Sequence, residues 1–147
     1  MVTLRHFLPE DARSVRVNLY PDMTEAQIRD MIADWNTCLW KGRYFEMFAV
    51  VSAQRTVGCV SLYEHTRSIA SAGVEIFRTE RRKGFASEAY PLLLAHAAQK
   101  GYKVILDQVS TDNPASIRLH EKLGFEKDDS VCVNRRGHDV FLYLKLL

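Results

Sequence analysis

The sequence contains little that would mark a secreted, metal-binding or membrane protein. It has three cysteines, Cys38, Cys59 and Cys132, with no C-x-x-C spacing and none of the histidine clustering that a zinc site needs. No stretch approaches the roughly 20 apolar residues of a membrane helix, and the first residues lack the basic and apolar regions of a signal peptide. We therefore expect a reduced, cytoplasmic protein with no membrane partner.

The histidines give no sign of a metal site either. His6, His65, His96 and His138 show no mutual spacing typical of metal ligands, so scattered structural roles are expected for them. No metal is predicted.

An excess of one charge is also missing. The chain carries 20 Lys and Arg against 18 Asp and Glu, a formal charge of +2, which is too small to indicate a nucleic-acid partner. No repeat, linker or low-complexity tract interrupts it. With 147 residues, 47% of them hydrophobic, the chain can bury the core of one compact domain. We expect a single domain over residues 1–147, and a homodimer stays open.

Strands and helices alternate along the predicted secondary structure. A capping box of Thr24 and Gln27 predicts a helix start. A helix over residues 84–100 connects strands 72–77 and 103–109, and such a crossover requires these strands to run parallel, whereas hairpins favour antiparallel neighbours. The remaining strands are predicted at 2–8, 44–52, 56–65, 125–133 and 139–146, and the remaining helices at 11–19, after Thr24, and at 114–123.

The turn Arg81-Arg82-Lys83-Gly84-Phe85-Ala86 leaves a predicted strand and opens a predicted helix. A helix N-terminus offers unpaired N–H groups and a partial positive charge, so it can bind an anion. Gly84 and Ala86 keep bulky side chains away from such a ligand. The spacing matches neither a Walker loop nor a dinucleotide-binding fingerprint, so a pyrophosphate-bearing ligand of another kind is indicated. The alternative is a basic, solvated helix start.

A second motif, D-N-P-A-S-I-R-L-H-E-K-L-G-F from Asp112 to Phe125, follows the next strand. It resembles the second signature of the GNAT superfamily of acyltransferases (GCN5-related N-acetyltransferases), and the turn at Gly84 resembles that family's R/Q-x-x-G-x-G/A motif. The element order of the whole chain is also similar to the family's. The resemblance implies an enzyme that transfers acetyl from acetyl-CoA to an amine of a small molecule or peptide, by direct attack in a ternary complex.

The resemblance also implies a fold and a binding mode for coenzyme A. The fold class is α/β (α+β), with a central mixed, mostly antiparallel, seven-stranded sheet flanked by about four helices. Strands 72–77 and 103–109, the fourth and fifth, should splay apart so that pantetheine enters the gap. Asn113 also suits a plain helix N-cap, and Arg82 and Lys83 plain surface charges. The residues assigned to coenzyme A are Val74, Ile76, Arg81, Arg82, Lys83, Gly84, Phe85, Ala86, Ser87, Asn113 and Ser116.

The catalytic positions depart from the family's pattern. His120 stands where many members carry a tyrosine that protonates the leaving thiolate. The alternative for His120 is a partly exposed helix residue that only packs against the cofactor. Many members also carry an acidic residue early in the fourth strand, where this chain has Ala70, Ser71 and Ala72.

Glu75 is the candidate general base, acting directly or through water if its environment raises its pKa toward neutrality. Glu64 and Asp107 are rivals, a solvated or salt-bridged carboxylate is the alternative for all three, and bulk water is a further candidate base. These departures keep a second function open, a CoA-binding regulatory or interaction module with little or no turnover.

Overall fold

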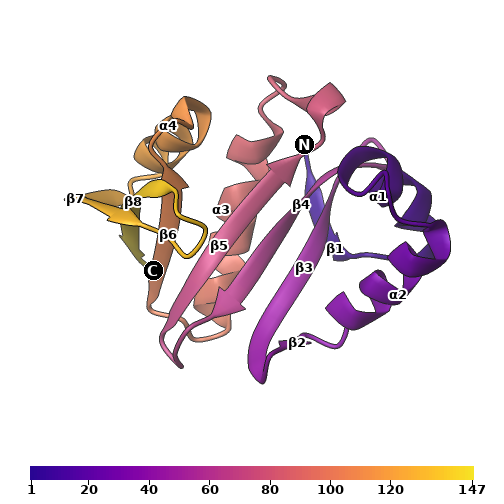
Figure 1. Ribbon diagram of the computed structural model, residues 1–147, viewed down its shortest axis with the longest axis horizontal. Helices are drawn as coiled ribbons and strands as arrows, with labels where there is room; N and C mark the ends of the chain where they lie inside the picture. Colours follow the sequence, from indigo (N-terminus) through magenta and orange to yellow (C-terminus); the bar gives the residue numbers. More distant parts are fainter.

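The chain folds into one sheet with helices on both faces (Figure 1). The computed structural model describes residues 1–147. The strands are β1 (Thr3–His6), β2 (Leu39–Trp40), β3 (Arg43–Ser52), β4 (Arg55–Glu64), β5 (Ile69–Ile76), β6 (Val104–Ser110), β7 (Glu126–Val133) and β8 (Asp139–Leu146). The helices are α1 (Ala12–Leu19), α2 (Glu25–Trp35), α3 (Phe85–Gln99) and α4 (Pro114–Lys122), with short 3-10 turns η1 (Pro9–Asp11) and η2 (Arg78–Glu80).

The sheet is mixed, as predicted. Its main path runs β1-β3-β4-β5-β6-β8-β7, and the two-residue strand β2 adds to β3. Every pairing is antiparallel except that of β5 with β6. The crossover helix α3 connects these two strands, which explains their parallel direction.

The parallel pair separates soon after it begins, and this confirms the predicted splay. Only Ile69 and Ala70 of β5 have partners in β6. Beyond them, side chains replace the backbone ladder. The Ser71 hydroxyl donates to the Leu106 carbonyl at 2.5 Å, and the Ala72 N–H donates to Asp107 Oδ1 at 2.8 Å. A gap between the strands is therefore lined by polar side chains.

Strand β5 starts earlier than the sequence indicated, at residue 69 instead of 72. The reason is a tight turn in which Thr66 Oγ1 accepts hydrogen bonds from the N–H groups of Ser68 and Ile69. The Ile69 carbonyl then accepts from the His65 N–H at 2.9 Å. The turn thereby extends the β4–β5 hairpin and brings Ala70 and Ser71 into the sheet.

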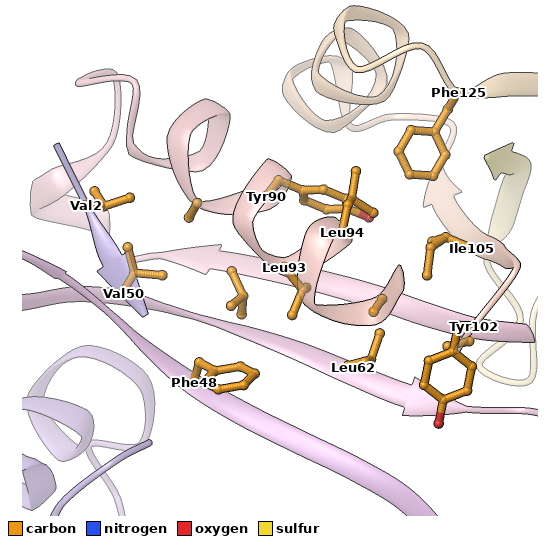
Figure 2. Packing of buried hydrophobic residues seen from close by; sticks show 14 of the residues in the cluster. Val2, Phe48, Val50, Leu62, Tyr90, Leu93, Leu94, Tyr102, Ile105 and Phe125 are labelled. Carbon is orange, nitrogen blue, oxygen red and sulfur yellow. The ribbon is translucent and has the colours of Figure 1, made fainter. Parts of the chain in front are cut away.

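The main core lies between α3 and the sheet (Figure 2). Tyr90 and Leu93 of α3 are fully buried there against strand residues such as Leu62. A fully buried side chain of this size contributes roughly 1.5–3 kcal/mol. This packing fixes α3 on the sheet, and with it the position of the helix N-terminus after β5.

A smaller core packs α1 and α2 on the opposite face, around Phe7, Val15, Ile28 and Ile32. The capping box at the start of α2 is confirmed, since Thr24 Oγ1 accepts from the Gln27 N–H at 3.1 Å. None of the helices combines the length and the apolar character needed to cross a bilayer.

Candidate active site

The turn from Arg81 to Ser87, here called the amide turn, presents a row of free backbone donors. Gly84 is the N-cap of α3 and has φ of +83°, a left-handed conformation that glycine adopts without a steric penalty. Arg82 also has a positive φ, +63°. None of the N–H groups from Arg81 to Ser87 donates to a protein acceptor. Such a row at a helix N-terminus can bind a phosphate group.

Ion pairs hold the amide turn in place. The 3-10 turn η2 before it ends at Glu80, whose carboxylate accepts hydrogen bonds from Arg55 Nη1 and Lys83 Nζ, both at 2.8 Å. Hydrogen bonds from Arg55 and then Lys83 lower the pKa of Glu80 to about 2. Arg81 Nε donates to the Ile76 carbonyl at 3.1 Å, and its Nη2 pairs with Glu75 at 2.9 Å. The turn is thus anchored to β4 and β5.

A pocket of about 580 Å³ lies over the amide turn, within the range of roughly 300–1,000 Å³ that ligand sites occupy. Its wall combines the end of β5, the start of α3 and the first turns of α4. All the residues that the sequence assigned to coenzyme A line it except Lys83, whose side chain turns to Glu80. Asn113 is also the N-cap of α4, with Oδ1 accepting from the Ser116 N–H at 3.1 Å.

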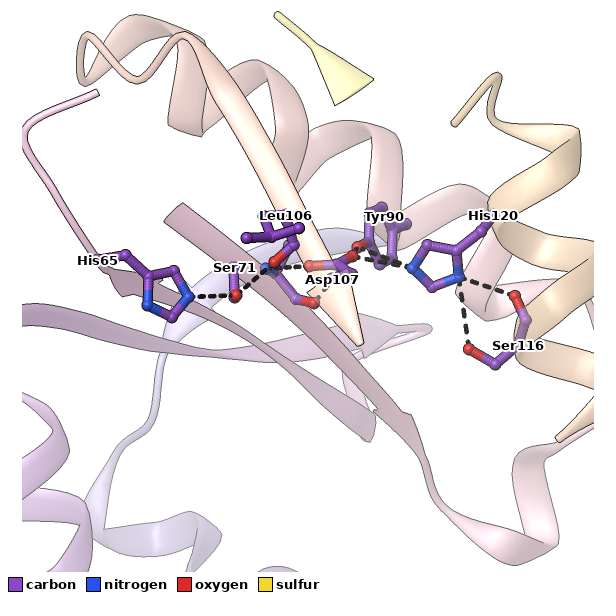
Figure 3. Close-up of polar contacts among 8 residues, drawn as sticks. His65, Ser71, Tyr90, Leu106, Asp107, Ser116 and His120 are labelled. Atoms are coloured by element: carbon purple, nitrogen blue, oxygen red, sulfur yellow. Dashed lines mark hydrogen bonds and ion pairs between the residues drawn. The ribbon is translucent and has the colours of Figure 1, made fainter. Parts of the chain in front are cut away.

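A second pocket adjoins the first, and Val74 and Ser116 line both. It occupies the gap between β5 and β6, and Asp107 of β6 lies in its wall, only 3% exposed. The Asp107 carboxylate accepts hydrogen bonds from the Ala72 N–H, from the Tyr90 hydroxyl and from His120 Nε2 (Figure 3). We call Asp107, Tyr90 and His120 the Asp107 unit.

His120 is buried, not partly exposed as the alternative interpretation had it. Its ring lies 4.8 Å from the Phe125 ring and 5.3 Å from the Tyr143 ring. Only 4% of the residue is exposed, although it lines the second pocket. Packing on three sides, with Tyr90 at 5.5 Å, therefore fixes the orientation of the imidazole.

The hydrogen bonds of the Asp107 unit indicate which of its atoms act as donors. His120 Nδ1 lies 2.8 Å from the Ser116 carbonyl and Nε2 lies 2.9 Å from Asp107 Oδ2. A carbonyl only accepts, so a hydrogen bond to it requires a hydrogen on Nδ1, while Nε2 faces the Asp107 carboxylate. Burial, followed by the charge of Asp107, raises the pKa of Tyr90, which keeps that hydroxyl a donor. The unit thus joins an imidazole, a carboxylate and a phenol by hydrogen bonds beside the gap.

A second hydrogen-bonded pair lines the same pocket, with His65 directly after β4 and Ser71 in β5. Ser71 Oγ gives its hydrogen to the Leu106 carbonyl, so His65 Nε2, 2.6 Å away, must donate to Ser71 Oγ (Figure 3). The lone pair of His65 is then on Nδ1. Burial, with a smaller effect from Arg43, lowers the pKa of His65. The ring is therefore neutral near pH 7 and can accept a proton.

Comparison with known proteins agrees with this geometry. Residues 2–126 match the family described as the acetyltransferase (GNAT) domain. The chain belongs to the GNAT family. A curated relative is the SPbeta prophage-derived uncharacterized N-acetyltransferase YokL of Bacillus subtilis (strain 168), 28% identical in an alignment of length 141, with 86% of this chain and 77% of YokL covered.

Solved GNAT structures share the fold at low identity. RimL, a ribosomal L7/L12 alpha-N-protein acetyltransferase in complex with coenzyme A, gives a TM-score of 0.85 at 15% identity, over 99% of this chain and 94% of RimL. Spermidine N-acetyltransferase from Vibrio cholerae, in complex with CoA and spermine, gives 0.79 at 21% identity, over 99% and 95%. The GNAT fold predicted from the two motifs is therefore confirmed.

The structure separates the three carboxylates considered as base in this GNAT chain. Glu75 is half exposed, pairs with Arg81 and lines the first pocket only. Glu64 accepts from the Tyr102 hydroxyl at 2.9 Å and lines neither pocket. Asp107 alone lies at the gap between the splayed strands, and there it is bound to His120.

Sequence reasoning missed His65, Ser71 and Tyr90. Ser71 entered only as a departure from the GNAT pattern, and Tyr90 lay unremarked in the crossover helix. Nothing local signals that Tyr90 and Asp107 meet, since they come from α3 and β6. The polar Ser71 at the place of the family's acidic residue was the one signal available.

His6 and His96, for which scattered structural roles were expected, share one partner. Each directs Nε2 at the buried carboxylate of Glu46, at 2.5 Å and 2.6 Å. The contact joins β1, β3 and α3, segments far apart in the sequence, so spacing along the chain could not reveal it.

Proposed function

We propose that this GNAT chain transfers acetyl from acetyl-CoA to a primary amine of a small molecule or peptide, by direct attack in a ternary complex. The observation that carries the proposal is that the two pockets adjoin, with Val74 and Ser116 in the wall of both. A ligand with its phosphates on the amide turn can then reach the Asp107 unit with its other end. An elongated donor such as acetyl-CoA fits that path.

The chain offers groups for each part of coenzyme A. Pyrophosphate oxygens would accept from the free N–H groups of the amide turn. Pantetheine would run along β5, where Val74, two residues after Ala72, directs its N–H toward the gap as Ala72 does. Arg82, and the backbone of Lys83, would add to the cradle.

Proton transfer in the proposed reaction uses groups on both sides of the gap. The amine nitrogen attacks the thioester carbonyl, the C–N bond forms, and the C–S bond then breaks. The departing thiolate takes a proton from His120 Nε2, which leaves its hydrogen bond to Asp107 Oδ2 in that step, and Asp107 would stabilise the imidazolium before the transfer. The neutral His65 accepts the proton that the amine loses, directly or through water. In this assignment Glu75 lies where the pyrophosphate of coenzyme A would bind, and not where the acceptor amine would bind.

Donor binding tests the cradle. Acetyl-CoA should raise the melting temperature, and Gly84→Glu should abolish the rise, since it places a carboxylate beside the anion. Gly137→Glu is the matched control, because Gly137 has φ of +80° against +83° and both positions have open space around them. It should keep the rise. An unchanged transition of the wild-type protein in excess acetyl-CoA contradicts the proposal.

Turnover tests the transfer itself. Release of free CoA is measured with a panel of amines that includes a peptide with N-terminal serine and spermidine, the acceptor types of the ribosomal and spermidine acetyltransferases. CoA should appear only when an amine is present. Tight binding without turnover across peptides, polyamines and other amines would favour the CoA-binding module instead.

His120→Gln separates the acid from its structural role. The amide can still donate to Asp107 but cannot protonate a thiolate. We expect kcat to fall by about 100-fold or more, with the acetyl-CoA-induced rise in melting temperature retained. A kcat within about threefold of wild type would remove His120 from the acid role.

His65 is tested by a pH profile of kcat/KM. The base acts in its neutral form, so the rate should hold near neutral pH and decline in acid, below the lowered pKa of His65. His65→Gln should lower the plateau by about 100-fold and remove that acidic decline. An unchanged profile would leave bulk water as the base.

A further inference from the structure

Four side chains that could bind a metal converge away from both pockets. They are His6 of β1, Cys38 in the connection from α2 to β2, Glu46 of β3 and His96 of α3. The candidate ligand atoms of His6, Cys38 and Glu46 all lie within 4.8 Å of one another. His96 Nε2 contacts the second oxygen of Glu46 at 2.6 Å. None of the four lines the pockets of the candidate active site.

Local structure directs each of these groups inward. Phe48 lies between the two imidazoles, with ring centroids 5.1 Å from His6 and 5.0 Å from His96, and is itself buried. The Cys38 carbonyl accepts from the Phe45 N–H, which places Cys38 beside Glu46. Cys38 also has φ of +57°, an uncommon conformation for a residue other than glycine.

We infer that His6 Nε2, Cys38 Sγ and Glu46 Oε2 bind a Zn²⁺ ion, with His96 orienting the carboxylate through its other oxygen. Imidazole nitrogen, thiolate sulfur and carboxylate oxygen are the donors that zinc takes, and three protein ligands leave a fourth position for water. The thiol gives up its proton on binding. Glu46 and the thiolate then balance the charge of the ion.

The fit requires the ligands to move by about 1 Å. The candidate atoms lie within 4.8 Å of one another, whereas a sulfur and a nitrogen around a tetrahedral zinc lie roughly 3.5 Å apart, so Cys38 Sγ approaches the other two by up to about 1.3 Å. His6 Nε2 and Glu46 Oε2 lie 2.5 Å apart, whereas two donors around a tetrahedral zinc lie roughly 3.4 Å apart, given bond lengths of about 2.0–2.2 Å. The two side chains therefore separate by less than about 1 Å. His6 is the more mobile partner, with 45% of its side chain exposed against 7% for Glu46, so the ion can enter from its side.

The second oxygen of Glu46 is held as ligating carboxylates usually are. Oε1 contacts His96 Nε2 and accepts from the Tyr44 hydroxyl, and such outer contacts orient a metal ligand. Lys100, whose Nζ lies 4.7 Å from the centroid of the Tyr44 ring, is the positive charge nearby. The metal would tie the α2–β2 connection to β1 and β3 at this end of the sheet.

Cobalt substitution tests the site on the whole metal-free protein. Co²⁺ should give a thiolate-to-cobalt charge-transfer band that one equivalent of Zn²⁺ abolishes. Cys38→Ser should lose the band, and Cys132→Ser, the matched control, should keep it. Absence of the band in the wild-type protein, or its persistence in Cys38→Ser, overturns the inference and leaves only two histidines paired with a carboxylate.

Zinc affinity separates ligands from the orienting residue. In competition with a chromophoric chelator, His6→Ala should weaken Zn²⁺ binding by more than about 100-fold and His96→Ala by roughly 10–100-fold. His138→Ala, in the exposed hairpin, should change nothing. Equal affinity in wild type, His6→Ala and His138→Ala contradicts the site, whatever the activity of these proteins.

Discussion

The amide turn and the Asp107 unit lie in adjoining pockets, but the first consists of backbone groups and the second of side chains. The amide turn offers backbone N–H groups, and its conformation depends on one glycine with positive φ. The Asp107 unit consists of three side chains from α3, β6 and α4, buried and bound to one another. The first tolerates different side chains at most of its positions, and the second depends on each of its members.

In the proposed function, the amide turn binds the ligand and the Asp107 unit takes part in the reaction. Free N–H groups at a helix start can donate hydrogen bonds to the oxygens of any phosphate. The amide turn by itself therefore discriminates little among phosphate-bearing ligands. Burying a carboxylate with a bound imidazole carries a desolvation penalty, and such buried titratable pairs are typical of groups matched to one chemical task.

The largest effect is expected from Asp107→Ala. It leaves the His120 imidazole, the Tyr90 hydroxyl and the Ala72 N–H without their acceptor inside the core. Removing one partner of a buried pair costs about 3–5 kcal/mol, which urea unfolding should show as a lower free energy of unfolding. Asp107→Asn, which can still accept from the Ala72 N–H, should cost less. Equal costs for the two variants would mean that charge pairing within the unit is unimportant.

A smaller effect is expected from Gly84→Ala in the amide turn. An added Cβ meets no atom within 4 Å, so the cost is that of a left-handed backbone alone, about 1–2 kcal/mol. Gly137→Ala has the same backbone cost in the hairpin between β7 and β8. Only Gly84→Ala should also weaken acetyl-CoA binding in calorimetry. Loss of affinity in both variants would attribute the effect to general instability.

The same contrast explains what the sequence could predict. The amide turn is local, since strand, turn and helix are consecutive, so Gly84 and its neighbours identify it. The parallel direction of β5 and β6 followed from the crossover rule, and their splay was implied by the family resemblance of the two motifs. The Asp107 unit and the contacts of Glu46 join residues tens of positions apart. Their partners depend on tertiary packing that periodicity does not encode.

Strong acid should loosen the anchoring of the amide turn. Glu80 has a pKa of about 2 against roughly 4.3 for an unperturbed glutamate. Its pairs with Arg55 and Lys83 thus contribute stability that is complete above about pH 5 and is lost as the pH falls toward 2. In urea unfolding measured over this range, Glu80→Gln should show a weaker dependence on pH than wild type. Parallel curves would remove Glu80 as the anchor.

The smallest effect on stability and on kcat is expected from Glu75→Gln. This change tests whether the carboxylate only supports the amide turn or acts as the general base. Its ion pair with Arg81 is exposed on both sides, 51% and 56%, and such pairs contribute about 0–1 kcal/mol. If Glu75 only supports the amide turn, kcat should change less than about twofold. A general base would lose about 100-fold or more. Steady-state kinetics beside His65→Gln distinguish the two, because a large loss in Glu75→Gln alone would move the base from His65 to Glu75.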